Sequence, residues 1–471
     1  MRGPCWTCRN RTMQCDQSRF PCSKCEKAGV ECSTKDHCDG QKLRSPASAK
    51  PLAPEGSPSL ALQDPRMSSL DRPSRFYIDY YNKRICKLYV LYGSDSNPIR
   101  NLLSYAMEDV ALQNSVVALA ARHFANTGHS FDPIDADSSP RFAKAELDAL
   151  HFKTQTMEAL SQSLSHKETC KKDAALATVL LLIFLDLLES GINGWNCHVQ
   201  GAKALHQSLA ESGSNGNADI DRGETVPEIR QFITRELFLI ETLGTAFSIS
   251  PSVYECSVEP QGSRHPESMV RSFLGCPEFL LRAIWFFSNQ RAPSMEYRRH
   301  DNPGMPAHIR DTIAMLELTD SFDCFEWASN FQQPGASSAM EINQLFMLSQ
   351  AYKMAALLYG RQVLGTQWTE TQDNEELVSR LLGLVEILKN DATLFKCLLW
   401  PMFMAGLGSQ AKSQQDAVIG FLGMLWYSTS CLNVISASNI LRDYWKQKEQ
   451  PGTRIQEMPD IDGLACGWLL I

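Results

Sequence analysis

The chain has 471 residues, of which 44% are hydrophobic and 21% are charged, and its net charge is −8. This composition is typical of a folded soluble protein and excludes a chain that is disordered throughout. The most apolar run extends from Ala174 to Leu185 before Asp186 interrupts it. It is shorter than the ~20 residues that cross a bilayer, so it predicts a buried core helix that ends near Gly191.

Six cysteines near the start of the chain repeat one spacing. They are Cys5, Cys8, Cys15, Cys22, Cys25 and Cys32. A C-x2-C-x6-C unit therefore occurs twice, and C-x2-C pairs direct two thiolates at one tetrahedral Zn²⁺. Six thiolates satisfy two zinc ions only if two of them bridge both metals, and Cys5 and Cys22 are the equivalent members of the two units. The spacing predicts a structural cluster of two Zn²⁺ ions.

Two other interpretations of these cysteines are weaker. A disulfide framework needs an oxidising compartment, and the opening Met-Arg-Gly-Pro-Cys has no apolar signal-peptide core. A metallothionein-like store is short and nearly all cysteine. The ten remaining cysteines have no ligand spacing, so we expect reduced, mostly buried thiols there.

The cysteine-rich stretch also resembles a known family. Arg9 and Arg11 follow the second cysteine, Asp16 follows the third and Pro21 precedes the fourth, as in the fungal zinc binuclear cluster of transcription regulators. The resemblance covers about 30 residues. It implies a nuclear regulator of RNA polymerase II genes, of a metabolic pathway or biosynthetic cluster. In this family the helix after the second cysteine enters the major groove of double-stranded DNA.

The charge distribution agrees with a nucleic-acid partner. Residues 1–50 carry a net charge of +5, which leaves −13 for the rest of the chain. An arginine guanidinium can bind a phosphate or form bidentate hydrogen bonds with guanine. The alternative interpretation of Arg9 and Arg11 is ordinary solvated charge. The predicted DNA-contacting residues are Arg2, Arg9, Arg11, Thr12, Gln14, Lys24 and Lys27.

One departure from the family concerns the basic helix. The family continues the arginines with lysines up to the third cysteine, whereas this chain has Thr12 and Gln14 there. These side chains form hydrogen bonds but neutralise no phosphate, so a lower affinity and a shallower salt dependence are expected. An alternative function follows: a weakly DNA-binding, partner-dependent co-regulator or effector-sensing module.

Residues 36–75 are predicted to be a flexible linker between a cluster domain at 1–35 and a body at 76–471. The linker is rich in proline and serine and has no apolar periodicity. It shows no heptad run, so any dimerisation must come from the body.

The body is predicted to be all helical. Apolar spacing predicts helices over 76–92 and after Asp109, which is a candidate cap, with Gly128 beyond the end of that helix. Asn374 is predicted to cap another helix, in which Glu375 and Glu376 occupy the first turn. Similar patterns occur near residues 142–164, 227–247, 268–289, 341–361 and 415–441. About ten to fifteen helices and no sheet are expected, so the fold class is a small metal-stabilised zinc cluster head plus a large all-α domain.

The body resembles the helical fungal-specific transcription factor domain. The landmarks are Phe76–Asn101, Ala118–His123, Trp195-x2-His198-x2-Gly201-Ala202 and Trp400–Gly406. This resemblance implies a regulatory region with no catalytic site. Self-association as a homodimer or heterodimer and a small-molecule effector are implied as candidates.

No catalytic chemistry is predicted for the body. His198 and His123 are interpreted as structural histidines, and the G-x-G-x-x-A match at 406–411 lacks a preceding strand. The apolar run 398–404 is interpreted as core, with an effector pocket as the alternative. The apolar end at Ile471 is compatible with a buried terminus or with a truncated sequence.

Overall fold

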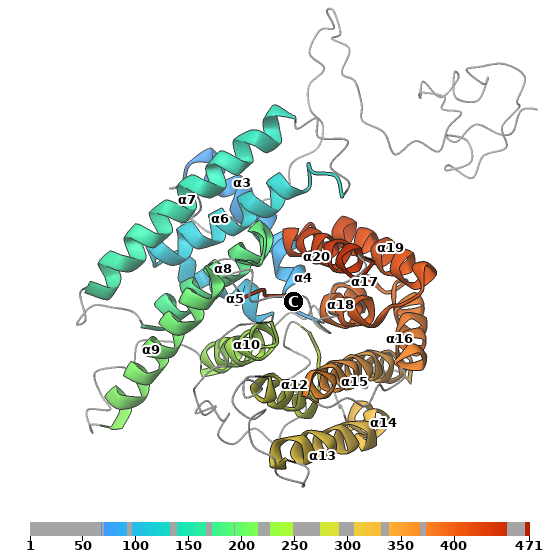
Figure 1. The fold of residues 1–471 in the computed structure, drawn as a ribbon. Helices are drawn as coiled ribbons and strands as arrows, with labels where there is room; N and C mark the ends of the chain where they lie inside the picture. The colour runs from blue at the N-terminus through green and yellow to red at the C-terminus, as the bar shows by residue number, and fades with distance from the viewer. Residues whose placement is uncertain are drawn as a thin grey trace, which may run out of the picture. The chain divides into compact units, whose positions relative to one another are not determined.

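The structure, a computed structural model, describes twelve ranges of the chain. They are residue 67, counted as the first, and residues 70–91, 97–131, 139–165, 172–192, 194–214, 227–247, 274–291, 306–330, 339–367, 374–449 and 467–471. The described residues form α-helices and one π-helical turn and contain no strand, which confirms the all-α body (Figure 1). The predicted head at 1–35 and most of the predicted linker lie outside the described residues.

The first helical segment of the described residues begins before the position predicted from the sequence. It comprises α3 (Arg72–Tyr80), the π-helical η2 (Tyr81–Ile85) and α4 (Cys86–Leu88). Asp71 caps α3 by accepting a hydrogen bond from the Ser74 backbone N–H at 3.1 Å. The helix predicted over 76–92 therefore starts earlier and ends at Leu88, because Tyr89 leaves the helical conformation.

Five helices follow and pack as neighbours. They are α5 (Pro98–Ala106), α6 (Val110–Asn126), α7 (Pro140–Ser165), α8 (Lys172–Glu189) and α9 (Trp195–Ser214). Helix α6 packs against α7 and α8, and α8 packs against α9. Asp109 caps α6 as predicted, accepting from the Leu112 backbone N–H at 2.9 Å. Helix α8 is the predicted core helix, and Asp186 continues it as a buried residue instead of interrupting it.

The remaining helices pack mainly around α15 and α18. They are α10 (Pro227–Thr245), α12 (Glu278–Gln290), α13 (Ala307–Ser321), α14 (Cys324–Ser329), α15 (Ala339–Gln367), α16 (Glu375–Leu388), α17 (Ala392–Phe395), α18 (Leu399–Gly408), α19 (Lys412–Thr429) and α20 (Leu432–Lys448). Residues 398–407 are all buried, which confirms that the run 398–404 is core. None of the helices in the described ranges has the length and apolar character that a bilayer crossing needs.

Three sequence predictions for this half were wrong in detail. Within the helix predicted over 268–289, residues 268–273 lie outside the described residues, 274–277 are not helical and α12 begins at Glu278, because Pro277 disfavours helical backbone in the residue before it. The helix predicted over 415–441 is two helices, broken where Ser430 adopts a left-handed φ of 50°. Asn374 precedes α16, but its side chain makes no capping bond and instead accepts a hydrogen bond from Arg361 at 3.3 Å.

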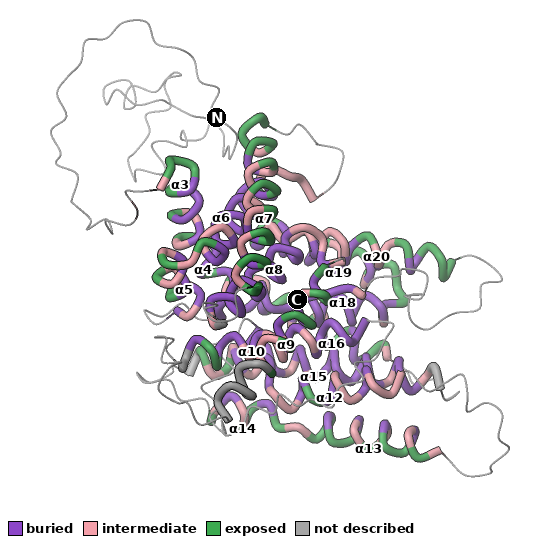
Figure 2. Tube along the Cα trace, turned by 90° about the vertical axis from the view of Figure 1, so that its left-hand side faces the viewer, coloured by how far each residue is buried: buried purple, intermediate pink, exposed green. Residues whose placement is uncertain are grey.

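Residues 467–471 lie between helices that are distant in sequence (Figures 1 and 2). The Leu469 backbone N–H donates to the Gly191 carbonyl at 2.8 Å, and the Trp195 indole N–H donates to the Gly467 carbonyl at 3.0 Å. The Asn433 side chain donates to the Ile471 carbonyl at 3.0 Å. The four side chains from 468 to 471 are buried, so this segment is part of the core.

We expect Gly191→Ala to lower the free energy of unfolding by about 2 kcal/mol or more. Gly191 has a φ of 70°, which costs an L-residue about 1–2 kcal/mol, and an added Cβ would lie 2.7 Å from the Leu469 carbonyl oxygen. Gly383→Ala in α16 is the matched control, because its Cβ would meet nothing within 4 Å. Chemical denaturation should show this control to be stabilised by roughly 0.5–1 kcal/mol. Equal effects of the two substitutions would contradict the packing of residues 467–471.

Candidate metal centre and buried polar network

Every residue predicted to bind metal or DNA lies outside the described residues. These are Cys5, Cys8, Cys15, Cys22, Cys25 and Cys32, together with Arg2, Arg9, Arg11, Thr12, Gln14, Lys24 and Lys27. The donor set itself fits the predicted metal, because repeated cysteine thiolates are the ligands of structural zinc sites. Their roles therefore remain predictions from the sequence.

The cysteines of the body that the structure describes are unlike metal ligands. Cys86, Cys276, Cys324 and Cys397 are buried free thiols, and Cys197 is exposed. Burial raises the pKa of Cys86 and of Cys397 to about 12, so both remain protonated at neutral pH, whereas zinc binds the thiolate. Within the described ranges, no three His, Cys, Asp or Glu side chains are grouped to hold a metal.

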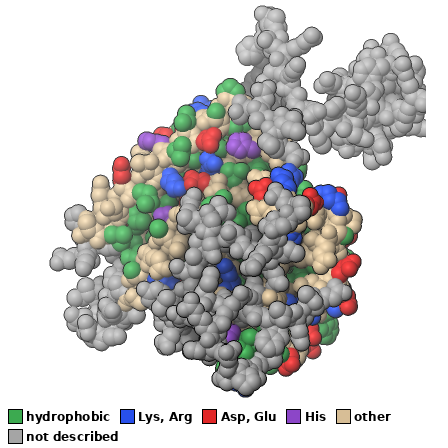
Figure 3. Space-filling model, viewed as in Figure 1, with side chains coloured by type: hydrophobic (Ala, Val, Ile, Leu, Met, Phe, Trp, Pro, Cys, Tyr) green, Lys and Arg blue, Asp and Glu red, His purple; other side chains and the backbone are tan. Residues whose placement is uncertain are grey.

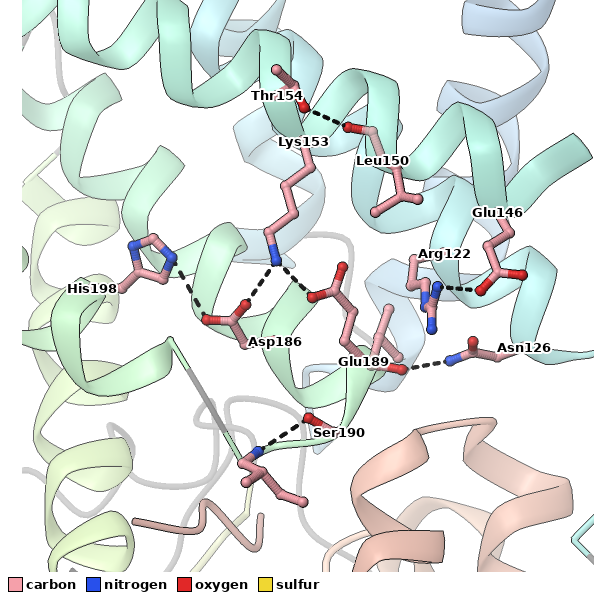
Figure 4. A network of polar contacts seen from close by, with 12 residues as sticks. Arg122, Asn126, Glu146, Leu150, Lys153, Thr154, Asp186, Glu189, Ser190 and His198 are labelled. Carbon is pink, nitrogen blue, oxygen red and sulfur yellow. Dashed lines mark hydrogen bonds and ion pairs between the residues drawn. The ribbon is translucent and has the colours of Figure 1, made fainter. Parts of the chain in front are cut away.

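A buried polar network joins α7, α8 and α9 (Figure 4). Lys153 of α7 donates a hydrogen bond to Asp186 Oδ1 at 3.1 Å and to Glu189 Oε2 at 2.6 Å, both on α8. The Asp186 side chain is only 4% exposed. A carboxylate removed from water needs a charged partner, and Lys153 supplies it.

His198 of α9 faces the other oxygen of Asp186. Its Nε2 lies 3.6 Å from Asp186 Oδ2, which is too far for a direct hydrogen bond, and this oxygen has no hydrogen-bond partner among the described residues. Burial, followed by the positive charge of Lys153, lowers the pKa of His198. The imidazole is therefore neutral at pH 7.

Burial also controls the pKa values of the two groups that carry charge. It raises the pKa of Asp186 to about 6, against the opposing effect of the Lys153 charge. Burial opposes the protonated form of Lys153, but the hydrogen bond to Glu189 and the charges of Asp186 and Glu189 leave its pKa raised. At pH 7 the lysine is therefore protonated and the Asp186 carboxylate is mostly ionised.

The turn between α8 and α9 brings His198 close to Asp186. Gly194 has a φ of 91°, and a Cβ at this position would lie 2.9 Å from Asp186 Oδ2. Only glycine meets both requirements, and it allows α9 to begin directly at Trp195. Consequently the Trp195 and His198 landmark holds residues 467–471 through its tryptophan and approaches the buried carboxylate through its histidine.

This arrangement supports a structural role and contains no nucleophile. The interpretation of His198 as a structural residue agrees with its position, but Lys153 and Glu189 were not predicted to be its neighbours. One signal was available: an aspartate directly after the most apolar run of the chain requires a cation when it is buried. The identity of that cation could not be inferred, because Lys153 is on another helix.

His123 of α6 is likewise a buried structural histidine. Its Nδ1 lies 2.8 Å from the Tyr80 hydroxyl, and the side chains share a hydrogen bond. Burial lowers the pKa of His123 to about 4. The Gly406–Ala411 match, the other suspected site, covers the end of α18 and does not join a strand to a helix.

We expect the body to lose stability as the pH falls from 7 to 5, in part through His123. The unfolded histidine takes up a proton near pH 6.5 and the folded one only near pH 4, so acid favours the unfolded state by roughly 2 kcal/mol at pH 5. Urea unfolding of wild type and His123→Gln at both pH values measures this contribution. An equal loss in the variant would exclude His123 as its source.

Comparisons with known proteins agree with both parts of the chain. The model of the fungal specific transcription factor domain matches residues 75–457, and that of the fungal Zn(2)-Cys(6) binuclear cluster domain matches residues 3–42. Acriflavine sensitivity control protein acr-2 of Neurospora crassa is 23% identical over 402 residues, covering 83% of this chain. The match covers 65% of acr-2, so the chain spans less than two thirds of that relative. No solved structure matches the chain.

Proposed function

Because the chain belongs to the fungal specific transcription factor domain family and carries a Zn(2)-Cys(6) binuclear cluster domain, we propose that it is a zinc-dependent, sequence-specific DNA-binding regulator of transcription. The observation that carries the proposal is the joint match of a cysteine-rich head and a helical body in one chain. The DNA-binding role places its action in the nucleus. We assign it no enzymatic activity.

The two zinc ions of the cluster stabilise the fold of the head in this proposal. Residues 3–42 are too few to bury a sufficient apolar core, so metal ligation supplies the folding free energy. The six cysteines of the repeated spacing are the proposed ligands, and Cys5 and Cys22 are the proposed bridges. The metal holds the segment after Cys8 in one conformation, from which its side chains meet DNA.

Arg9 and Arg11 are the proposed centre of the DNA contact. A guanidinium can donate two hydrogen bonds to the O6 and N7 atoms of guanine or pair with a phosphate. Arg2, Lys24 and Lys27 add positive charge for the phosphates, and Thr12 and Gln14 add hydrogen bonds. Phosphate contacts fix the register of the head on the duplex, and base contacts choose the sequence.

Adding charge at positions 12 and 14 should change the salt dependence of binding. We expect Thr12→Lys/Gln14→Lys to bind DNA more tightly and to steepen the slope of log K against log salt by about 0.9 per new phosphate contact, or nearly 2 in all. Fluorescence anisotropy over a salt series measures this slope. The control is Thr12→Ala/Gln14→Ala, which adds no charge.

The same experiment separates the two candidate functions. A partner-dependent co-regulator binds DNA weakly alone, and the lysines should then create autonomous binding that the natural sequence lacks. An unchanged slope would show that neither position faces a phosphate. Strong binding by the natural sequence would contradict the partner-dependent function.

The helical body is the proposed regulatory part. Its buried core and its internally paired charges suit a domain that adopts one defined conformation. We propose that this domain self-associates and binds an effector, and that both events regulate the head. The body contributes most of the acidic excess of the chain, so it does not compete with the head for DNA.

Selection of binding sites by the purified full chain from a randomised duplex pool tests the proposal. We expect enrichment of a short motif, and the number and spacing of its copies report the oligomeric state on DNA. Wild-type protein that retains two zinc ions but enriches no motif would overturn the proposed function.

A further inference from the structure

The outer face of α7 carries an apolar stripe that the described residues leave uncovered. Its members, with their exposed fractions, are Leu147 (67%), Leu150 (50%), Met157 (45%) and Leu164 (37%). The opposite face is buried through Ala145, Ala149, Thr156 and Leu160. Helix α7 runs along one edge of the body in Figure 1, exposed residues recur along it in Figure 2, and hydrophobic side chains appear on this side in Figure 3. A single exposed leucine is ordinary, whereas a row along one helix marks a contact surface.

The spacing of the stripe is that of a helix-pairing seam. Leu150, Met157 and Leu164 are seven residues apart, and Leu147 precedes Leu150 by three. Thr154 and Ser161 fill the alternate positions and are also exposed. A repeat of 3.5 residues keeps one row of side chains against a second helix. We call these six residues the α7 seam.

We propose that the α7 seam is a homodimer interface, in which α7 of a second copy of this chain packs antiparallel across a two-fold axis. In this register Leu147 packs against Met157 of the second copy, and Leu150 packs against Thr154. The two-fold symmetry repeats both contacts. Each leucine of these pairs therefore packs against a smaller side chain, Thr154, or a flexible one, Met157.

The charges beside the seam favour the antiparallel direction. Lys144, His151 and Glu158 form an exposed row on one side of it, again seven residues apart. The antiparallel register sets Lys144 of each copy opposite Glu158 of the other, and the two copies of His151 meet near the axis. Lys144 also pairs with Asp148 at 3.0 Å within its own helix, and Glu158 has no ion pair among the described residues.

A parallel pairing lacks this complementarity. It would place the row of Lys144, His151 and Glu158 opposite the other side of the seam of the second copy. The charged residues on that side, Glu146 and Lys153, already form ion pairs within their own copy. Glu146 accepts a hydrogen bond from Arg122 at 3.0 Å, and Lys153 binds Asp186 and Glu189. Neither charge is available to a second copy without breaking these contacts.

The interface is small, which sets the expected affinity. In this register position 143 of one copy lies opposite position 161 of the other, and the helix between them is about 27 Å long. One helix pair of this length buries less than the ~1,600 Å² of a standard complex. We therefore expect dissociation in the micromolar range, tightened when two heads bind one DNA and raise the effective concentration. The inference rests on the proposed function only for the use of the dimer, so a measurement without DNA tests it separately.

Sedimentation velocity of the full zinc-loaded chain over a concentration series is the test. We expect a monomer–dimer equilibrium that Leu150→Lys weakens by about tenfold or more, because a charge replaces a buried leucine in two layers. Leu318→Lys is the matched control, since Leu318 is 54% exposed on α13, and it should leave the equilibrium unchanged. Glu158→Lys should weaken the dimer several-fold, and Lys144→Glu/Glu158→Lys should restore it to within about twofold.

The outcomes separate the alternatives. Restoration by the double charge reversal supports the antiparallel register. A wild-type monomer at all concentrations, or equal weakening by Leu150→Lys and Leu318→Lys, overturns the proposal. If another segment of the same chain covers the seam, Leu150→Lys lowers the melting temperature of a protein that is already monomeric, which also overturns it.

Discussion

Replacing Cys15 by alanine is expected to abolish sequence-specific DNA binding by the full chain. Six thiolates hold two zinc ions only by sharing, so no cysteine is spare, and loss of Cys15 leaves one metal with an incomplete ligand set. Structural zinc contributes about 10–16 kcal/mol to the folding of such small domains, which have no other source of stability. Zinc content should fall below two ions per chain, and affinity for the selected site should fall at least ~10³-fold, to the nonspecific level.

Two other cysteines provide matched controls for this experiment. Cys197 is an exposed free thiol of α9. Cys38 comes after the second C-x2-C-x6-C unit in the sequence and belongs to neither unit. Alanine at either position should leave two zinc ions and full DNA affinity. A Cys15→Ala protein that keeps both metals and the same site preference would refute the proposed ligand set.

Replacing Lys153 by methionine is expected to lower the free energy of unfolding of the body by about 3–5 kcal/mol. Methionine keeps most of the length of the side chain but removes the charge that compensates Asp186, which is 4% exposed. Lys83→Met is the matched control, because Lys83 pairs with Asp79 on the surface and is 70% exposed. Loss of that pair should cost less than about 1 kcal/mol.

The pH dependence of Lys153→Met identifies the cause of its instability. Lys153 lowers the pKa of Asp186, which is about 6 in its presence, so the pKa should be higher in the variant. Because the unfolded carboxyl titrates near 3.8, the folded variant binds the extra proton first as the pH falls, and its deficit relative to wild type should shrink between pH 7 and pH 5. Lys153→Met/Asp186→Asn should recover much of the stability at pH 7. A deficit that is constant with pH would indicate lost packing instead of an uncompensated charge.

Sequence patterns located most helices because their signals are local. The apolar run of α8, its end at Gly191 and the Asp109 cap of α6 depend on neighbouring residues only. The break at Ser430 was missed because a serine with a left-handed φ has no sequence signature, and its carbonyl accepts a hydrogen bond from Asn126 of a distant helix. The Asn374 cap failed for the same kind of reason, since Arg361 takes the side-chain oxygen.

The candidate sites also differ in whether local sequence signals or contacts between distant helices define them. The six zinc ligands remain a prediction from the sequence, in which closely spaced cysteines can bind one metal, and the family comparison agrees with a zinc cluster domain in this part of the chain. The buried network could not be predicted, because Lys153, Asp186 and His198 come from three helices and meet only in the folded body. The α7 seam occupies an intermediate position: its heptad spacing is local, but its exposure depends on which face α6 covers.

The hydrogen bond between Trp195 and Gly467 connects residues that are 272 positions apart. A ribosome adding about 5–20 residues per second needs roughly 15–55 s to synthesise that interval. Throughout this time the nascent α8 and α9 lack residues 467–471, whose backbone and four buried side chains pack against them in the folded body. The body is therefore a natural client for chaperones during translation, and attempts to express its first half alone should yield aggregated protein.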